Sequence, residues 1–229
     1  MKKVEAPRAS AVAASDTVVI VVVVVDQEKV YTLHRRLLIH HSGFFRRVLT
    51  DGVNILHLRE LSNFVFGEFD FDFIIDNFDV FVDWLYERSL PSCFDTTGTK
   101  DTDVDPMLSV YVLAHKLSVG SLKNTLMDSL FDWLSDGRYH LGNAEFMFEY
   151  LPGGDPLLQL AIDAFCFNDG VKEMSKTIIE WVDYLPQEFL VGVIRRMHHF
   201  STLPEADRKL KREDYNIVEC VSSEDKDGE

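Results

Sequence analysis

Three histidines, His34, His40 and His41, form the densest group of potential metal ligands in the sequence. Imidazole nitrogen binds zinc and iron, but a metal site also needs further cysteine, histidine or carboxylate ligands brought close by. The sequence offers no paired spacing of such residues around this cluster. A metal-dependent enzyme built on the three histidines is therefore kept only as an alternative.

Sequence motifs of known catalytic chemistry are missing. The chain has no Gly-x-Ser-x-Gly, His-Glu-x-x-His or Gly-x-Gly-x-x-Gly motif and no complete P-loop. Acidic residues are abundant, but acid–base catalysis needs two carboxyl groups held in a cleft with different environments. Here they fall in predicted loops and on polar helix faces. We therefore expect no enzyme activity, no cofactor, no metal and no small-molecule substrate.

Net charge and cysteine content limit which binding partners and which cellular compartment we expect. The formal net charge of −15 should repel phosphate backbones and anionic membrane surfaces, so neither nucleic acid nor membrane is expected as a partner. The three cysteines, Cys93, Cys166 and Cys220, are far apart and form no Cys-x-x-Cys pair. This pattern favours a reducing compartment, cytoplasmic and/or nuclear.

A run of eight apolar residues from Val18 to Val25 predicts a buried strand. It is too short to span a bilayer, which takes about 20 residues. Because the run is apolar on both faces, we expect it to be central in its sheet. The polar turn 26–29 and the short segment Val30–Leu33 complete a hairpin, and Asn54–Leu58 predicts a third strand.

Helices are predicted from apolar spacing and capping residues. His34 to Ile39 should begin the first helix, and Ser42 should cap a second one. Asn77 to Arg88 has helical spacing. Asp105-Pro106 and Asp155-Pro156 are typical helix starts. We expect Gly120 to end the helix 107–119 and Ser121 to cap the next helix. That next helix has an apolar stripe formed by Leu122, Leu126, Leu130 and Leu134. The helix 187–199 should also bury one apolar stripe, formed by Phe189, Leu190, Val193, Ile194 and Met197.

Several of these motifs resemble a BTB/POZ domain. The pattern starts at Asp16 and continues through Tyr31-x-Leu33-His34-Arg35-x-x-Leu38 and Ser42-Gly43-x-Phe45, and the segments Phe81–Tyr86, Leu113–Leu117 and Leu122–Asn124 also match. The resemblance implies an α+β fold, in which a small mixed sheet from an N-terminal hairpin is flanked by α-helices. The later part is similar to fungal BTB proteins, which carry an all-α C-terminal extension.

The predicted organisation has four parts. These are a flexible arm (1–15), the BTB/POZ domain (16–137), the helical extension (138–203) and a disordered acidic tail (204–229).

The resemblance implies a protein–protein interaction module for oligomerisation or adaptor binding. Its partner would be a second copy or a cullin, the latter making it a substrate adaptor of a ubiquitin ligase. Asp16 and Arg35 match positions that line a charged pocket in related domains; a partner contact and a structural ion pair both stay open. Tyr86 is a further candidate contact.

One acidic and aromatic stretch departs from the family. Between Ser62 and Asp76 the sequence alternates phenylalanine with acidic residues, and its candidate contact residues are Phe64, Phe66, Phe69, Phe71 and Phe73. The alternation predicts an added edge strand with one buried face. Such a strand could cover the domain's own core or bind a partner, and the sequence leaves both open.

Overall fold

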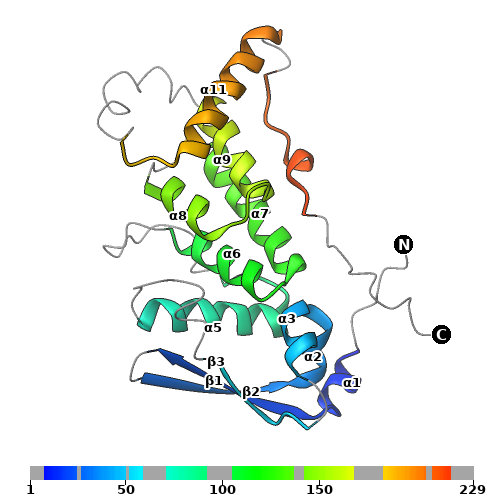
Figure 1. The fold of residues 1–229 in the computed structure, drawn as a ribbon. Coiled ribbons are helices and arrows are strands. Elements are labelled where there is room, and N and C mark those ends of the chain that lie inside the picture. Colours follow the sequence, from blue (N-terminus) through cyan, green and yellow to red (C-terminus); the bar gives the residue numbers. More distant parts are fainter. Residues whose placement is uncertain are drawn as a thin grey trace, which may run out of the picture.

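A small sheet lies at one end of an elongated molecule, and helices stack away from it (Figure 1). The computed structural model describes residues 8–24, 27–49, 52–58, 71–91, 105–136, 142–167, 183–204 and 208–217. The described part is mixed α+β, as the sequence predicts.

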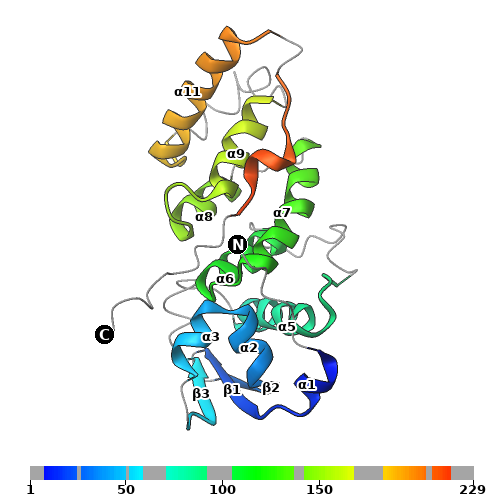
Figure 2. The same cartoon turned by 90° about the vertical axis from the view of Figure 1, so that its right-hand side faces the viewer.

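The sheet has three strands in the order β2-β1-β3. They are β1 (Thr17–Val24), β2 (Gln27–His34) and β3 (Ile55–Leu58). β1 pairs antiparallel with β2 and parallel with β3, so the predicted hairpin, third strand and central position of the valine run are all confirmed. Among the described helices, those that cover the sheet lie on one face (Figures 1 and 2).

Two short helices make the crossover that a parallel strand pair requires. They are α2 (Arg35–His41) and α3 (Gly43–Val48). Ser42 caps α3 as predicted, because its hydroxyl oxygen accepts from the Phe45 N–H at 3.0 Å. The same hydroxyl donates to the Leu117 carbonyl at 2.6 Å, which ties the crossover to the helical stack.

The helix on the sheet, α5 (Phe71–Glu87), begins six residues before the predicted start. The predicted edge strand is therefore wrong from Phe71 onward, and its earlier part, with Phe64, Phe66 and Phe69, lies outside the described residues. The physical reason is spacing. Phe71, Ile75, Phe78 and Val82 follow a helical period, so Phe71 continues the pattern of the helix, and Phe73 lies in the same first turn.

The remaining helices form a stack on α5. They are α6 (Pro106–Lys116), α7 (Gly120–Ser135), α8 (Gly142–Tyr150), α9 (Pro156–Phe167) and α11 (Gln187–Thr202), followed by the single 3-10 turn η3 (Arg212–Tyr215). Both predicted Asp-Pro starts are confirmed. Asp105 accepts from the Met107 N–H at 2.8 Å, and Asp155 accepts from the Leu157 N–H at 3.1 Å.

Gly120 does not end α6, as the sequence predicted; it is the first residue of α7. The left-handed residue between the two helices is Ser118, with φ of 53°. The Val119 N–H bonds back to the Ala114 carbonyl at 2.8 Å, which closes the turn. Gly43 lies against this turn, and a Cβ there would stand 3.0 Å from the Ser118 Cβ, so a larger residue at position 43 would have to displace Ser118.

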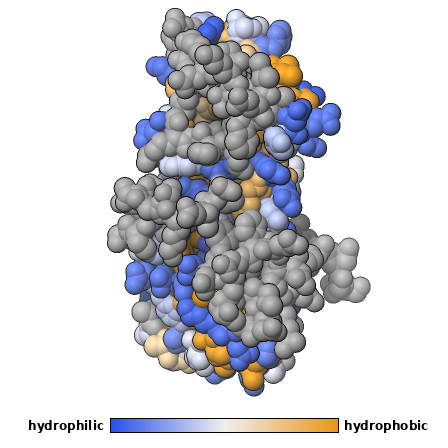
Figure 3. Space-filling model, turned by 90° about the vertical axis from the view of Figure 1, so that its left-hand side faces the viewer, coloured by the Kyte–Doolittle hydropathy of each residue, from blue (hydrophilic) through white to orange (hydrophobic). Residues whose placement is uncertain are grey.

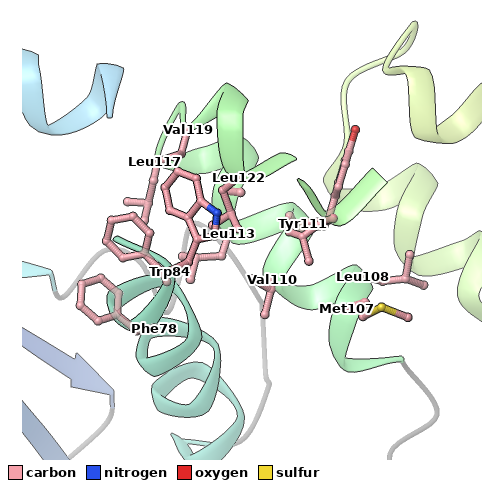
Figure 4. Packing of buried hydrophobic residues seen from close by; sticks show 14 of the residues in the cluster. Phe78, Trp84, Met107, Leu108, Val110, Tyr111, Leu113, Leu117, Val119 and Leu122 are labelled. Atoms are coloured by element: carbon pink, nitrogen blue, oxygen red, sulfur yellow. The ribbon is translucent and has the colours of Figure 1, made fainter. Parts of the chain in front are cut away.

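One hydrophobic cluster runs from the sheet through α5, α6, α7, α8 and α9 (Figure 4). Trp84 of α5 and Leu113 of α6 are typical members, each about 1% exposed. The described parts of the predicted BTB/POZ domain and helical extension therefore share a core, whereas the first half of α11 packs on a second, smaller cluster.

The structure also differs from the sequence prediction at both ends. Within the predicted flexible arm, Ala9–Ala13 forms the helix α1 and buries Val12. Within the predicted disordered tail, residues 208–217 pack on the helices, and Tyr215 is only 3% exposed. The tail prediction is therefore wrong for this segment, because its aromatic and basic side chains find specific partners; residues 218–229 lie outside the described part.

Candidate interaction surface

The face of the sheet that points away from the helices is the first candidate surface. Registered partners in neighbouring strands share a face, and alternate residues along a strand point to opposite faces. Val18, Ile20 and Val22 point toward the helices and are buried. The opposite side, which we call the outer sheet face, consists of Val19, Val21, Val23, Glu28, Val30, Thr32, Ile55 and His57.

The outer sheet face carries two large exposed apolar side chains beside the exposed polar residues Glu28, Thr32 and His57, whereas the β1 valine Val21 is only 6% exposed. Val30 is 56% exposed and Ile55 is 58% exposed, and they lie on either side of the central strand. Figure 3 shows apolar side chains gathered at the end of the molecule where the sheet lies. A solvent-facing side of a sheet is normally polar, so a run of valine on this side marks a surface suited to binding.

Charged groups beside β2 are used within the fold. Lys29 Nζ lies 2.6 Å from Asp79 Oδ2, and the Tyr31 hydroxyl donates to Asp79 Oδ1 at 2.8 Å. Burial and the neighbouring Asp79 carboxylate raise the pKa of Tyr31. These contacts fasten β2 to α5 on the inner side of the sheet.

Tyr86, a predicted contact residue, lies at the end of β2. Its hydroxyl accepts from the His34 N–H at 3.2 Å and lies 2.9 Å from His34 Nδ1. The ring remains 44% exposed, so it can still contribute to a surface.

The predicted histidine cluster divides into two parts. His34 pairs with Tyr86, whereas the rings of His40 and His41 meet edge to face with centroids 4.4 Å apart. His41 also packs edge-on against Trp84 at 5.7 Å. Among the described residues no group of three histidine, cysteine or carboxylate side chains could hold a metal ion.

Asp16 and Arg35 come together through the backbone. The Arg35 N–H donates to the Asp16 carbonyl at 2.9 Å, which closes the start of the hairpin. The Arg35 guanidinium donates to the Val53 carbonyl and lies 3.4 Å from Asn54 Oδ1. Arg35 therefore holds residues 53 and 54, which directly precede β3, against the start of α2. Phe71 and Phe73 fall in the first turn of α5.

Two buried carboxylates were missed by sequence analysis. Asp155 accepts from Lys123 Nζ at 2.6 Å and from the Tyr111 hydroxyl at 2.8 Å. Asp163 binds Arg196 and Gln159, and it accepts from the Tyr215 hydroxyl at 2.7 Å. Their oxygens are occupied by structural partners. The only sequence signal was the Asp-Pro helix start at Asp155.

The stripe predicted on α11 is only half buried. Phe189 and Val193 pack inside, but Ile194 is 68% exposed. A groove of about 620 Å³ lies between α9 and α11, with Ile162 and Val191 among its lining residues. Cys166 is a half-buried free thiol, and burial raises its pKa to about 12, so thiolate chemistry is disfavoured there.

Acid should destabilise the fold through His41. Burial chiefly, with the charges of Arg88 and His40, lowers the pKa of His41 from 6.5 to about 4. As pH falls from 6.5 toward 4, His41 becomes protonated in the unfolded chain but stays neutral in the folded chain. The free energy of unfolding therefore decreases in that pH range. Allowing for partial exposure, we expect His41 to account for a loss of about 1 kcal/mol between pH 7 and pH 5.

Urea unfolding of the wild type and of His41→Phe at both pH values measures this contribution. Phenylalanine keeps a ring on Trp84 but removes the titration, so the variant should lose less stability on acidification. The exposed His199→Phe is the control and should behave as the wild type does. An equal acid response in the wild type and in His41→Phe would rule out the assignment; His115, whose pKa burial also lowers, contributes to all three proteins.

Among the described helices, none combines the length and apolar character that a bilayer crossing requires. Compared with known proteins, the sequence matches no protein-family model and has no significant match among curated proteins.

Proposed function

We propose that this protein is a protein–protein interaction module of the BTB/POZ type and that it binds through the outer sheet face. The observation that carries the proposal is the pair of large apolar side chains on the outer sheet face, Val30 and Ile55, which are more than half exposed. Burying such a surface against a partner releases water from apolar groups, at about 25 cal/mol per Å².

The order of the elements supports the BTB/POZ assignment. A hairpin is followed by two short helices, a third strand parallel to the first, a helix on the sheet and a helical pair, in line with what the resemblance implies. The buried carboxylates support binding rather than catalysis, because Asp155 and Asp163 are held by cationic and hydroxyl partners inside the core.

The proposed partner is a second copy of the chain. The net charge of −15 opposes association at long range, but salt screens it, with a Debye length of about 8 Å at 0.15 M. Self-association through an apolar face should therefore strengthen as salt is raised, whereas an association driven by ion pairs would weaken.

The test is light scattering of the full chain over a range of protein and salt concentrations. The double variant Val30→Glu/Ile55→Glu places charge on the outer sheet face, and we expect it to remain monomeric where the wild type assembles. Ile194→Glu is the control, because Ile194 is an apolar residue that is 68% exposed on α11, at the other end of the molecule. The control should assemble as the wild type does.

In a narrower form of the proposal, the protein is a substrate adaptor of a cullin-type ubiquitin ligase. The helices from α8 onward would then bind the substrate. A purified cullin N-terminal region is its direct probe. If the wild type is monomeric at all concentrations and fails to bind this probe, the proposed function is wrong in both forms. If it assembles or binds, but Val30→Glu/Ile55→Glu does so equally well, the outer sheet face is the wrong surface.

A further inference from the structure

Residues 208–217, which we call the carboxy-terminal strap, run beside α7 and α9 (Figures 1 and 2). Apart from the single turn η3, the strap has no regular structure of its own. It is held by side-chain contacts to the two helices. Leu210 and Ile217 are partly buried against the main hydrophobic cluster.

Asn124 of α7 holds the backbone of the strap. Its side-chain oxygen accepts from the Ile217 N–H at 3.3 Å, and its side-chain nitrogen lies 3.5 Å from the Ile217 carbonyl oxygen. An amide that pairs with both backbone groups of one residue fixes the register of an extended chain without depending on that residue's side chain. The helix therefore binds the strap as a receptor binds a peptide.

Two side chains of the strap contact the helices, Tyr215 in the core and Arg212 at the surface, where the Asp128 side chain is 70% exposed. Arg212 Nε donates to Asp128 Oδ1 at 2.7 Å, and a second guanidinium nitrogen lies 3.3 Å from the Asn124 carbonyl oxygen. The Tyr215 hydroxyl donates to Asp163 Oδ2 at 2.7 Å, and its ring packs on Phe131 at 6.1 Å. The surface of α7 and α9 that the strap covers, which we call the groove between α7 and α9, thus contacts a cation, an aromatic hydroxyl three residues later and an aliphatic residue two further on.

We propose that the groove between α7 and α9 is a binding site for a short peptide segment of the form Arg-x-x-Tyr-x-Ile from a partner protein. The carboxy-terminal strap fills this groove in cis and acts as an autoinhibitory ligand. The side chains expected of the partner peptide are those of the strap residues that contact α7 and α9, namely Arg212, Tyr215 and Ile217. This site is separate from the outer sheet face and does not depend on it.

The cis strap sets the affinity for a partner. A tethered segment competes at an effective concentration on the order of millimolar, so only the fraction of molecules with the strap released can bind. The apparent dissociation constant equals the intrinsic one divided by that fraction. Weakening the strap without changing the groove must therefore tighten the binding of a free peptide.

The experiment uses a fluorescent peptide with the sequence of residues 208–217 and the full chain. Arg212→Ala/Tyr215→Phe alters only the strap, and we expect it to bind the peptide at least tenfold more tightly than the wild type does. Adding Asn124→Ala and Asp128→Ala, which alter only the groove, should abolish that gain. Lys209→Ala/Lys211→Ala is the strap control and should bind as the wild type does, because both lysines are exposed.

The proposal is overturned if Arg212→Ala/Tyr215→Phe gains no affinity, or if the gain survives the loss of Asn124 and Asp128. A peptide with alanine and phenylalanine in place of its arginine and tyrosine must also bind at least tenfold more weakly. If it binds equally well, the groove does not select the proposed chemistry. If the strap variant forms dimers by exchanging straps but takes up no peptide, the site serves self-association only and the proposal fails.

Discussion

Replacing Lys123 by methionine is expected to lower the free energy of unfolding by about 3–5 kcal/mol. The Lys123 and Asp155 side chains are 8% and 3% exposed, and their charged atoms lie 2.6 Å apart. Methionine fills much of the same volume but leaves the carboxylate buried without its cation. The Tyr111 hydroxyl and the Leu157 N–H still donate to it, but neither carries a charge.

Urea denaturation at pH 7 measures the cost, and a second lysine gives the control. Lys29 and Asp79 are also 2.6 Å apart, but their side chains are 43% and 38% exposed. We expect Lys29→Met to cost less than about 1 kcal/mol. In the double variant Lys123→Met/Asp155→Asn the buried charge is gone, and part of the stability should return. Equal costs for the two lysine variants would contradict this account.

Elements whose signals are local could be predicted from the sequence. The valine run and the short segment after it specify a hairpin because both lie within twenty residues and strand propensity decides them. The caps at Ser42, Asp105 and Asp155 also depend on only two or three neighbouring residues. The α+β class follows from these elements.

Features that depend on distant residues could not be predicted. Asp163 and Tyr215 are 52 positions apart, and Lys123 and Asp155 are 32 apart, so no spacing rule connects either pair. Lys123 stands next to a leucine stripe on α7 and looks like an ordinary exposed residue. Its burial follows only when the N-terminus of α9 packs beside it.

The valine run shows a different limit. Its composition indicated that both faces of β1 are apolar, and this is correct. Composition cannot tell whether a second layer covers the outer side, because that depends on how many helices the chain provides and where they pack. The outer sheet face could not be predicted for this reason. The phenylalanine alternation, which the sequence did indicate as a contact surface, is helical in its described part.

Replacing Phe45 by alanine is expected to lower the free energy of unfolding by about 3–5 kcal/mol. Phe45 is fully buried and lies parallel to Phe81 of α5, with ring centroids 6.2 Å apart. It is the residue through which α3 reaches the core, and its N–H is also the donor to the Ser42 cap. Alanine keeps the cap but leaves a cavity between the crossover helices and α5, which loses the transfer energy of the ring and its packing contacts.

Thermal and urea unfolding of Phe45→Ala measure the cost, with Phe167→Ala as the control of identical chemistry. Phe167 is 42% exposed at the end of α9, so its loss should cost less than about 1 kcal/mol. Because the outer sheet face exists only in the folded protein, Phe45→Ala should also weaken self-association near its unfolding transition. If the two alanine variants unfold at the same urea concentration, Phe45 does not anchor the crossover to the core, because the same ring was removed from both sites.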